Sequence, residues 1–177
     1  MKLTITFQDY KNANALESIL KCILDSDCQL AELRSLNLAD INAGHLLING
    51  NWNHIAKLES SLSILSQNYN IDLQMHRIEK PQEYNHTIPY LIETFALEKK
   101  DILSNLMAFF IEREITVVEI SSSLYPAHHV NSSLLSSKFI IAIPEQQAII
   151  SLREEFLDYC DHLNIDAILE PIKSKIL

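Results

Sequence analysis

The order of apolar patterns along the chain occurs twice, and this repetition constrains the fold more than any other feature of the sequence. In each copy, a segment with the alternation of a strand is followed by a helical stripe, two more strand patterns, a second helical stripe and a last strand pattern. The polar segment KPQEYN, residues 80–85, separates the two copies. The sequence therefore predicts two structural units built on one plan.

The first copy contains four strand patterns and two amphipathic helices. The strand patterns cover residues 3–7, 28–38, 44–48 and 71–76, with a turn expected at residues 40–43. The apolar stripes of the helices consist of Leu16, Ile19, Leu20, Ile23 and Leu24, and of Ile55, Leu58, Leu62 and Leu65. In the second strand, Ala31 and Leu33 are out of phase with Leu36 and Leu38, which indicates a β-bulge.

The second copy follows the same order. Strand patterns cover residues 87–95, 117–124, 139–143 and 165–169, and residues 126–133 are expected to form the loop of a long hairpin. The helical stripes consist of Leu103, Leu106, Met107 and Phe110, and of Ile149, Leu152, Phe156, Cys160 and Leu163.

Two helices with one apolar stripe each are both buried when they cover the same face of an antiparallel sheet, which is the split-βαβ or ferredoxin-like plan. We therefore expect an α+β protein with two tandem ferredoxin-like (βαββαβ) domains. The first is expected at residues 1–79, a linker at residues 80–85, and the second domain at residues 86–177.

Charge and glycine content exclude several classes of function. The chain carries 14 Lys and Arg against 23 Asp and Glu, a formal net charge of −9. It has no basic cluster to match a phosphate backbone, so direct nucleic-acid binding is disfavoured. The only two glycines, Gly44 and Gly50, do not form a GxGxxG motif or a P-loop. We expect no cofactor.

The amino-terminal residues MKLTITFQDY alternate from the start, and the chain has no long apolar segment. Neither a signal peptide nor a membrane span is expected. Three cysteines without the spacing of a disulfide framework are typical of a reducing compartment. We expect a soluble, cytoplasmic protein.

Catalytic and metal-binding motifs are missing from the sequence. It contains no Gly-x-Ser-x-Gly, His-Glu-x-x-His or Cys-x-x-Cys. The best nucleophile candidates are Cys28, at a strand entry, and Cys160, on an apolar helix face, and both positions favour a structural role. The adjacent His128 and His129 have no Cys or carboxylate at ligand spacing, which favours a solvated loop over a metal site. We expect no catalytic residues and no metal ligands.

The single tryptophan, Trp52, precedes a predicted helix for which Asn51 or Asn53 could be the N-cap. Its ring either fixes the start of that helix against the sheet or forms part of a partner surface.

Three segments resemble one family. The segment from Cys28 to Trp52, CQLAELRSLNLADINAGHLLINGNW, resembles, without a gap, a region of the glycine cleavage system transcriptional repressor family that runs from a Cys-Asn-Ile-Glu-Asp type start to a Ser-Gly-x-Trp end. The helix NHIAKLESSL, residues 53–62, resembles the family's helix with a Leu-Glu pair. ITVVEI, residues 115–120, resembles an Asn-Ile-x-Glu-Leu stretch of its second half. The resemblance covers nearly the whole chain in length and element order.

Members of that family consist of two tandem ACT domains, each ferredoxin-like. The resemblance implies a cytoplasmic, non-enzymatic regulator that binds no DNA itself, responds to glycine and acts through a LysR-type transcriptional activator of the glycine cleavage operon. ACT domains usually pair their sheets side by side, so a homodimer is expected. The alternatives are a stand-alone tandem ACT sensor of another amino acid or small metabolite, and an enzyme on a ferredoxin-like frame.

Amino-acid-binding ACT domains usually carry an Asp-x-Pro-Gly type loop between the first strand and the first helix, where glycine lets a ligand approach the backbone. The corresponding loops, residues 9–14 and 97–101, contain neither Gly nor Pro. We therefore expect weak glycine binding or none, because Cβ atoms hinder the approach and Asp101 would repel a carboxylate. The ligand-binding residues that the resemblance implies are Asn12, Asn14, Gln29 and Thr116.

Overall fold

Alternate residues of the central strands, such as Leu3, Ile5 and Phe7, are buried against helices, and this pattern produces two separate cores. The computed structural model describes residues 1–10, 15–78, 87–127 and 132–172. The chain divides into two units, Met1–Gln82 and Glu83–Leu177. The predicted linker, residues 80–85, lies outside the described residues.

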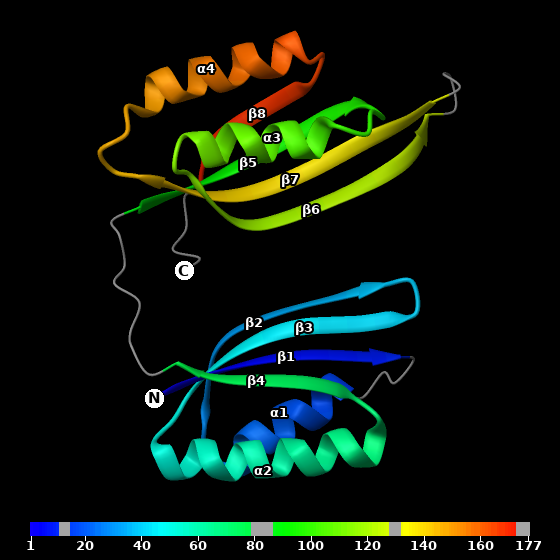
Figure 1. Ribbon diagram of the computed structural model, residues 1–177, viewed down its shortest axis with the longest axis vertical. Helices are drawn as coiled ribbons and strands as arrows, with labels where there is room; N and C mark the ends of the chain where they lie inside the picture. The colour runs from blue at the N-terminus through cyan, green and yellow to red at the C-terminus, as the bar shows by residue number, and fades with distance from the viewer. Residues whose placement is uncertain (11–14, 79–86, 128–131, 173–177) are drawn as a thin grey trace. The chain divides into compact units, whose positions relative to one another are not determined.

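The first unit has the element order predicted for the first copy. Its elements are β1 (Lys2–Tyr10), α1 (Ala15–Asp25), β2 (Gln29–Leu38), β3 (Ile41–Asn49), α2 (Trp52–Tyr69) and β4 (Asp72–Ile78). The four strands form an antiparallel sheet in the order β2-β3-β1-β4. Both helices cover the same face of this sheet (Figure 1). Leu3, Ile5 and Phe7 of β1 pack there against Ile19 and Leu58 of the helices.

The second unit repeats this plan. Its elements are β5 (Thr87–Leu97), α3 (Ile102–Glu112), β6 (Thr116–Ala127), β7 (Ser132–Pro144), α4 (Ile149–His162) and β8 (Asp166–Pro171). Its sheet has the equivalent order β6-β7-β5-β8, and α3 and α4 cover one face. The described residues thus confirm the prediction of two βαββαβ units with antiparallel sheets.

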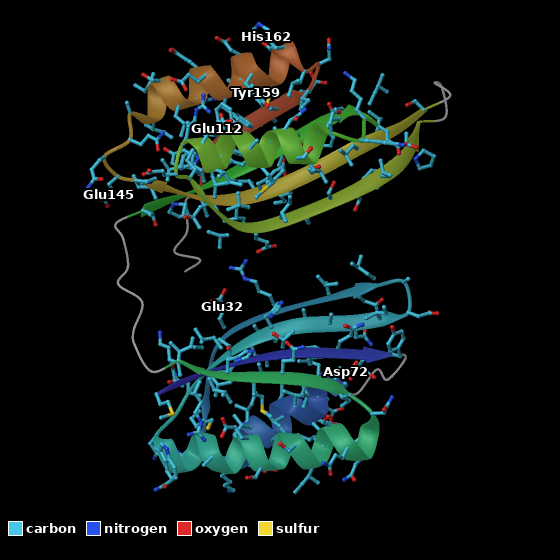
Figure 2. The ribbon with its side chains drawn as sticks, in the orientation of Figure 1. Glu32, Asp72, Glu112, Glu145, Tyr159 and His162 are labelled. Carbon is cyan, nitrogen blue, oxygen red and sulfur yellow. The ribbon has the colours of Figure 1, made fainter. Side chains whose placement is uncertain are left out.

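Aromatic contacts dominate the core of the second unit. Phe110 contacts Phe139 and Phe156 with ring centroids 5.6 Å apart in both cases, and Phe109 contacts Phe156 at 5.3 Å. The hydroxyl of Tyr159 on α4 donates to the Asn105 carbonyl of α3 at 3.2 Å, which ties the two helices together (Figure 2). No helix in the described ranges is long and apolar enough to cross a membrane.

The β-bulge predicted in the second strand is confirmed. The pairing of β2 with β3 shifts between Leu30 and Glu32, so Ala31 is the extra residue. The second unit has a bulge at the equivalent place, between Val117 and Glu119 of β6, which the sequence pattern did not reveal. Both bulges lie two residues after the start of their strand.

The residue bounds predicted for two hairpin loops are wrong. Leu38 pairs with Ile41, so the first hairpin turns at Ala39 and Asp40 and not over residues 40–43. Ala39 adopts φ 53°, which lies in the left-handed region that glycine usually occupies. The alternation of apolar and polar residues in a strand does not predict such a backbone conformation. In the second unit, β6 and β7 extend into the predicted loop, because Pro126 pairs with Ser133. His128 and His129 lie outside the described residues.

Candidate functional site

Of the four predicted ligand-binding residues, the structure describes two. Asn12 and Asn14 lie outside the described residues. Gln29 and Thr116 are the exposed first residues of β2 and β6, which are equivalent strands in the two units. Gln29 is paired with Asn49 and Thr116 with Ala142. Their role in binding stays a prediction.

Asp101, the residue before α3, is hydrogen bonded to the first turn of that helix. The Asp101 carbonyl accepts from the Asn105 amide at 2.9 Å and from the Ser104 hydroxyl at 2.8 Å. The Asp101 carboxylate accepts from the side-chain amide of Asn105 at 3.3 Å. A negative charge therefore occupies the start of α3, where a ligand carboxylate would otherwise benefit from the helix dipole.

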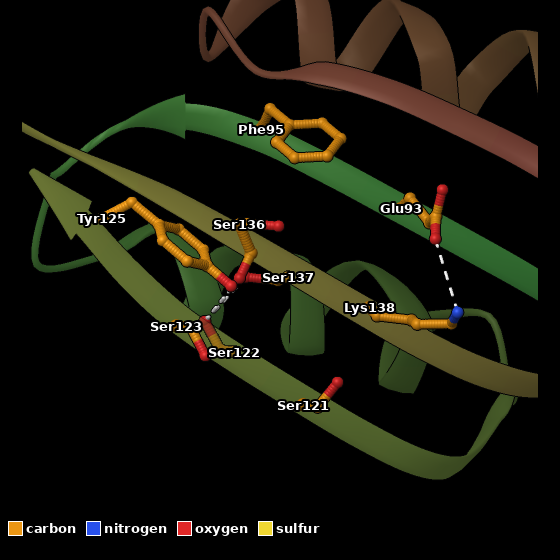
Figure 3. Close-up of a pocket in the computed structure, with 9 residues that line it drawn as sticks. All are labelled: Glu93, Phe95, Ser121, Ser122, Ser123, Tyr125, Ser136, Ser137 and Lys138. Carbon is orange, nitrogen blue, oxygen red and sulfur yellow. Dashed lines mark hydrogen bonds and ion pairs between the residues drawn. The ribbon is translucent and has the colours of Figure 1, made fainter. Parts of the chain in front are cut away.

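A hollow of about 180 Å³ lies on the sheet of the second unit (Figure 3). Its lining comes from three neighbouring strands, β5, β6 and β7. The lining residues are Glu93, Phe95, Ser121, Ser122, Ser123, Tyr125, Ser136, Ser137 and Lys138. No single stretch of sequence contains this set, because the strand register brings it together.

Strand alternation places most of this lining on the face opposite the helices. Ile92, Thr94 and Phe139 are buried beneath α3 and α4, so their neighbours Glu93, Phe95 and Lys138 point to the open face. The cross-strand pairs arrange the open face in rows. The first row contains Ser121, Lys138 and Glu93, and the second row contains Ser123, Ser136 and Phe95.

The first row holds one positive and one negative charge. Lys138 Nζ lies 3.4 Å from Glu93 Oε1, and the two side chains are 52% and 41% exposed. An exposed ion pair of this kind contributes little to stability, so either group can turn to another partner at small cost.

Hydroxyl groups and aromatic rings complete the hollow. The hydroxyls of Ser122 and Ser137 lie 2.8 Å apart, beside the second row. Phe95 and Tyr125 remain 47% and 56% exposed at the end of the hollow away from the ion pair. The arrangement can bind a small molecule that has both charges and an apolar part.

The thiols are poorly suited to catalysis. Burial raises the pKa of Cys160 to about 12, with a further contribution from Asp161. Burial also raises the pKa of Cys22 and of Cys28, next to Asp25 and Asp27 respectively. These cysteines are therefore protonated at neutral pH and weak nucleophiles.

Two histidines of the first unit have structural partners. His45 Nδ1 lies 2.9 Å from the Thr6 hydroxyl, and His54 Nδ1 lies 2.9 Å from the Asp27 carbonyl oxygen. Within those ranges, no three His, Cys, Asp or Glu side chains are grouped so as to hold a metal ion.

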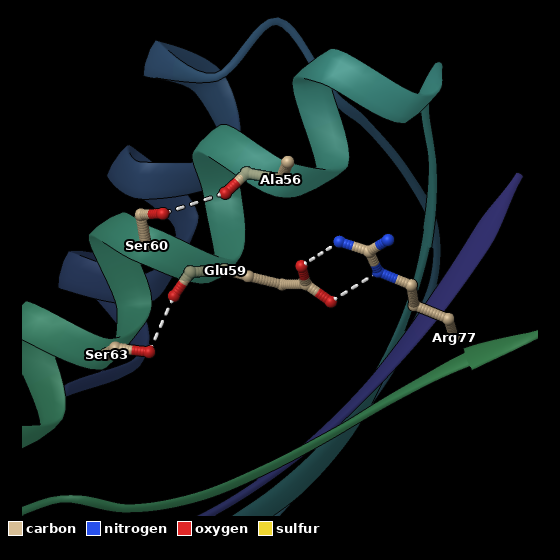
Figure 4. Close-up of polar contacts among 5 residues, drawn as sticks. All are labelled: Ala56, Glu59, Ser60, Ser63 and Arg77. Carbon is tan, nitrogen blue, oxygen red and sulfur yellow. Dashed lines mark hydrogen bonds and ion pairs between the residues drawn. The ribbon is translucent and has the colours of Figure 1, made fainter.

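Trp52 is the first residue of α2 and is 61% exposed, with the Arg77 guanidinium 5.8 Å from its ring centroid. Arg77 also forms a two-point ion pair with Glu59, shown in Figure 4. The Asn51 side chain accepts from the His54 amide at 2.9 Å, so Asn51, and not Asn53, is the N-cap. Most of the tryptophan surface is thus open to solvent.

Comparison with known proteins supports the fold. No family model and no curated protein matches the chain in sequence. A crystal structure of a protein of unknown function from Galdieria sulphuraria superposes with a TM-score of 0.76 at 13% identity, covering 97% of this chain and 98% of that one.

A second crystal structure is that of a protein described as a candidate glycine cleavage system transcriptional repressor. It superposes with a TM-score of 0.75 at 19% identity, covering 98% of each chain. The fold that the sequence resemblance implies is thereby confirmed over the whole length. The chain has the same tandem βαββαβ fold as the structure described as a candidate glycine cleavage system transcriptional repressor.

Proposed function

We propose that the chain is a non-enzymatic regulatory protein that acts by contact with a DNA-binding activator. The observation that carries the proposal is the full-length likeness to the structure described as a candidate glycine cleavage repressor, with 98% of both chains covered. The independent likeness of the Cys28–Trp52 segment to that family supports it. The proposed partner is a LysR-type transcriptional activator of the glycine cleavage operon.

The chemistry of the described residues agrees with a role without catalysis. Burial keeps the cysteines protonated, and the formal net charge of −9 opposes direct DNA binding. A chain with this net charge and no basic cluster in its sequence is better suited to reach a promoter through a protein partner. We accordingly propose that the activator, and not this chain, contacts the operator.

The open sheet face of the second unit supplies apolar surface for protein contacts. Exposed apolar side chains on its strands include Phe95, Leu97, Leu134, Tyr125 and Ile168. Contiguous exposed apolar surface of this kind is characteristic of interaction sites. We also propose a cytoplasmic location and a homodimer, the latter because edge strands leave unpaired backbone groups that a second copy can cover.

Co-purification tests the proposal. The tagged chain is mixed with the purified LysR-type activator encoded beside the glycine cleavage genes of the same organism, and with an unrelated LysR-type protein as the matched control. We expect retention of the first and not of the second. Equal retention of both, or of neither, would contradict the proposed mechanism.

A second candidate function is a stand-alone sensor of another amino acid or small metabolite. The hollow of the second unit favours it, because its lining combines two charges, hydroxyls and aromatic rings. A thermal-shift screen over the amino acids is the test, since a ligand that binds only the folded state raises the unfolding temperature. Stabilisation by one amino acid with no activator binding would favour this candidate over the first.

A further inference from the structure

We infer that the hollow on the open sheet face of the second unit binds a zwitterionic amino acid with a large apolar side chain. This inference deepens the second candidate function and rests on it, because it names the class of amino acid that the hollow takes. The predicted residues Asn12, Asn14, Gln29 and Thr116 are not involved, whereas Phe95 and Tyr125 also belong to the apolar surface proposed for protein contacts. The inference rests on the strand register around the hollow and on the chemistry of its lining.

The first row provides partners for both charges of a zwitterion. Lys138 offers an ammonium group to a carboxylate, and Glu93 offers a carboxylate to an ammonium group. They lie 3.4 Å apart and are about half exposed, so the ligand replaces a weak contact by two charge-assisted hydrogen bonds. A ligand with only one charge would leave one member of the pair without its partner.

Hydroxyl groups lie beside these charges. Ser121 belongs to the first row, and Ser123 and Ser136 belong to the second. Each lines the hollow, and a serine hydroxyl can donate to a carboxylate or accept from an ammonium group. They can hold the charged end of the ligand without adding a net charge.

The aromatic rings of Phe95 and Tyr125 favour a ligand with a large apolar side chain. Residues two apart on one strand face are separated by about 7 Å, so Phe95 lies about that far along β5 from Glu93. Tyr125 lies one row further along on β6, which β7 separates from β5, because its partner on β7 is Leu134. A ligand held at the first row therefore extends its side chain toward Phe95, with Tyr125 in the row beyond. Glycine has no atoms to cover them, whereas phenylalanine does.

The first unit lacks this combination at the equivalent positions. There the row that corresponds to Ser121, Lys138 and Glu93 contains Arg34, His45 and Thr6. Thr6 and His45 are already hydrogen bonded to each other at 2.9 Å, and Arg34 Nε donates to Glu32 at 2.9 Å. The next row contains Gln8 and Leu36 and no aromatic ring, and the row beyond it contains one ring, that of Tyr10. We therefore assign one such site to the described part of the chain, in the second unit.

The test is calorimetry on the full chain with L-phenylalanine as the probe. The charge requirement is examined with 2-phenylethylamine, which lacks the carboxylate, and with 3-phenylpropionate, which lacks the ammonium group. Glycine tests the requirement for a side chain. We expect L-phenylalanine to bind and each of the other three to bind about tenfold more weakly or not at all.

Two variants and one matched control locate the site. K138M and E93Q each remove one charge while keeping side-chain length, and each should weaken L-phenylalanine binding about tenfold or more. K21M removes a lysine from a comparable exposed ion pair, Lys21 with Glu17 at 2.7 Å in the first unit, and should leave binding unchanged. Thermal unfolding of each variant verifies that it is folded.

Amide chemical shifts give a second readout that needs no substitution. L-phenylalanine should move the amide signals of Phe95, Ser123, Tyr125 and Ser136. Shifts confined to Gln29 or Thr116, unchanged affinity in K138M, or no binding of L-phenylalanine at millimolar concentration would each overturn the inference. Because the activator is absent from these measurements, failure here leaves the proposed regulatory function standing, and the reverse also holds.

Discussion

Glu59 and Arg77 connect α2 to β4 by two parallel hydrogen bonds, one of them 2.8 Å long from Arg77 Nε (Figure 4). The two side chains are 25% and 33% exposed, so solvent screens the pair only partly. We predict that E59Q lowers the free energy of unfolding of the first unit by about 1 kcal/mol near neutral pH. Urea unfolding followed by Trp52 fluorescence measures it, because this tryptophan lies beside Arg77.

The same pair makes a prediction about pH. The hydrogen bond from Arg77 lowers the pKa of Glu59 below its ordinary value of 4.5. A carboxyl group with a lowered folded-state pKa stabilises the fold above the unfolded-state pKa, and this contribution is lost as pH falls through the folded-state pKa. The difference between wild type and E59Q should therefore shrink below pH 4.5. A difference that grows on acidification would show that another group is responsible.

Position 44 requires glycine because neighbouring atoms leave no room for a Cβ atom. Its backbone does not have a positive φ. A Cβ atom there would lie 2.6 Å from the Arg34 carbonyl oxygen and 2.6 Å from Cε1 of the buried Phe7. The equivalent residue of the second unit is Ser137, opposite Thr94 and not opposite a phenylalanine. A side chain is therefore accommodated there because the residue facing it is smaller.

We predict that G44A lowers the free energy of unfolding by about 1–3 kcal/mol, since overpacking a core shifts its neighbours. G50A is the matched control. Its added Cβ would lie 3.1 Å from the Cys28 Sγ atom and from Ile55 Cδ1, and both can move slightly. Denaturant midpoints compare the two, and an equal loss in both variants would contradict the tighter packing at Gly44.

At the scale of the elements, a single side chain, that of Asn51, fixes where α2 begins. The Asn51 side chain accepts from the His54 amide, whereas the N-cap residues of α3 and α4, Asp101 and Ala148, make no side-chain cap hydrogen bond. We predict that N51A destabilises the first unit by about 1 kcal/mol. N53A, one position inside the helix, should change the unfolding temperature much less. The reverse ranking would assign the cap to Asn53.

Periodicity predicted the elements because burial follows it. Leu3, Ile5 and Phe7 alternate in the sequence, and all three are buried against the helices. The phase change between Leu33 and Leu36 led to the prediction of a bulge, and the strand has one at Ala31. The register is regular from Leu33 to Leu36, however, and the phase change arises because Leu36 and Leu38 are exposed apolar residues of the face away from the helices. The bulge at Val118 was missed because Val117, Val118 and Ile120 are apolar on both sides of it, so no phase change is visible.

Turns and sites depend on information that a pattern does not contain. The first hairpin turns at Ala39 because this residue adopts a positive φ, and its side chain gives no sign of that conformation. The hollow escaped prediction for a different reason. Glu93, Ser121 and Lys138 come together only through the registers of β5, β6 and β7. A serine run such as residues 121–123 indicates a polar strand face but not what lies across from it.

At the scale of the whole molecule, the described core residues form two clusters, one drawn from each unit. We predict that the fragments 1–82 and 83–177 each fold alone, because neither core cluster needs a residue of the other. Circular dichroism and cooperative thermal unfolding of the separate fragments test this. Fluorescence from Trp52 reports on the first fragment alone. A non-cooperative transition in either fragment would contradict independent cores.

The central claim is that regulation takes place by protein contact and not by direct DNA binding. The most direct measurement is an electrophoretic mobility shift with operator DNA at physiological salt, using this chain alone, the activator alone and both together. With a net charge of −9, the chain alone should produce no shift that survives competitor DNA. Added to the activator, it should change the mobility or the amount of the activator–DNA complex. A specific shift by the chain alone, or an activator–DNA complex that the chain leaves unchanged, would contradict the account.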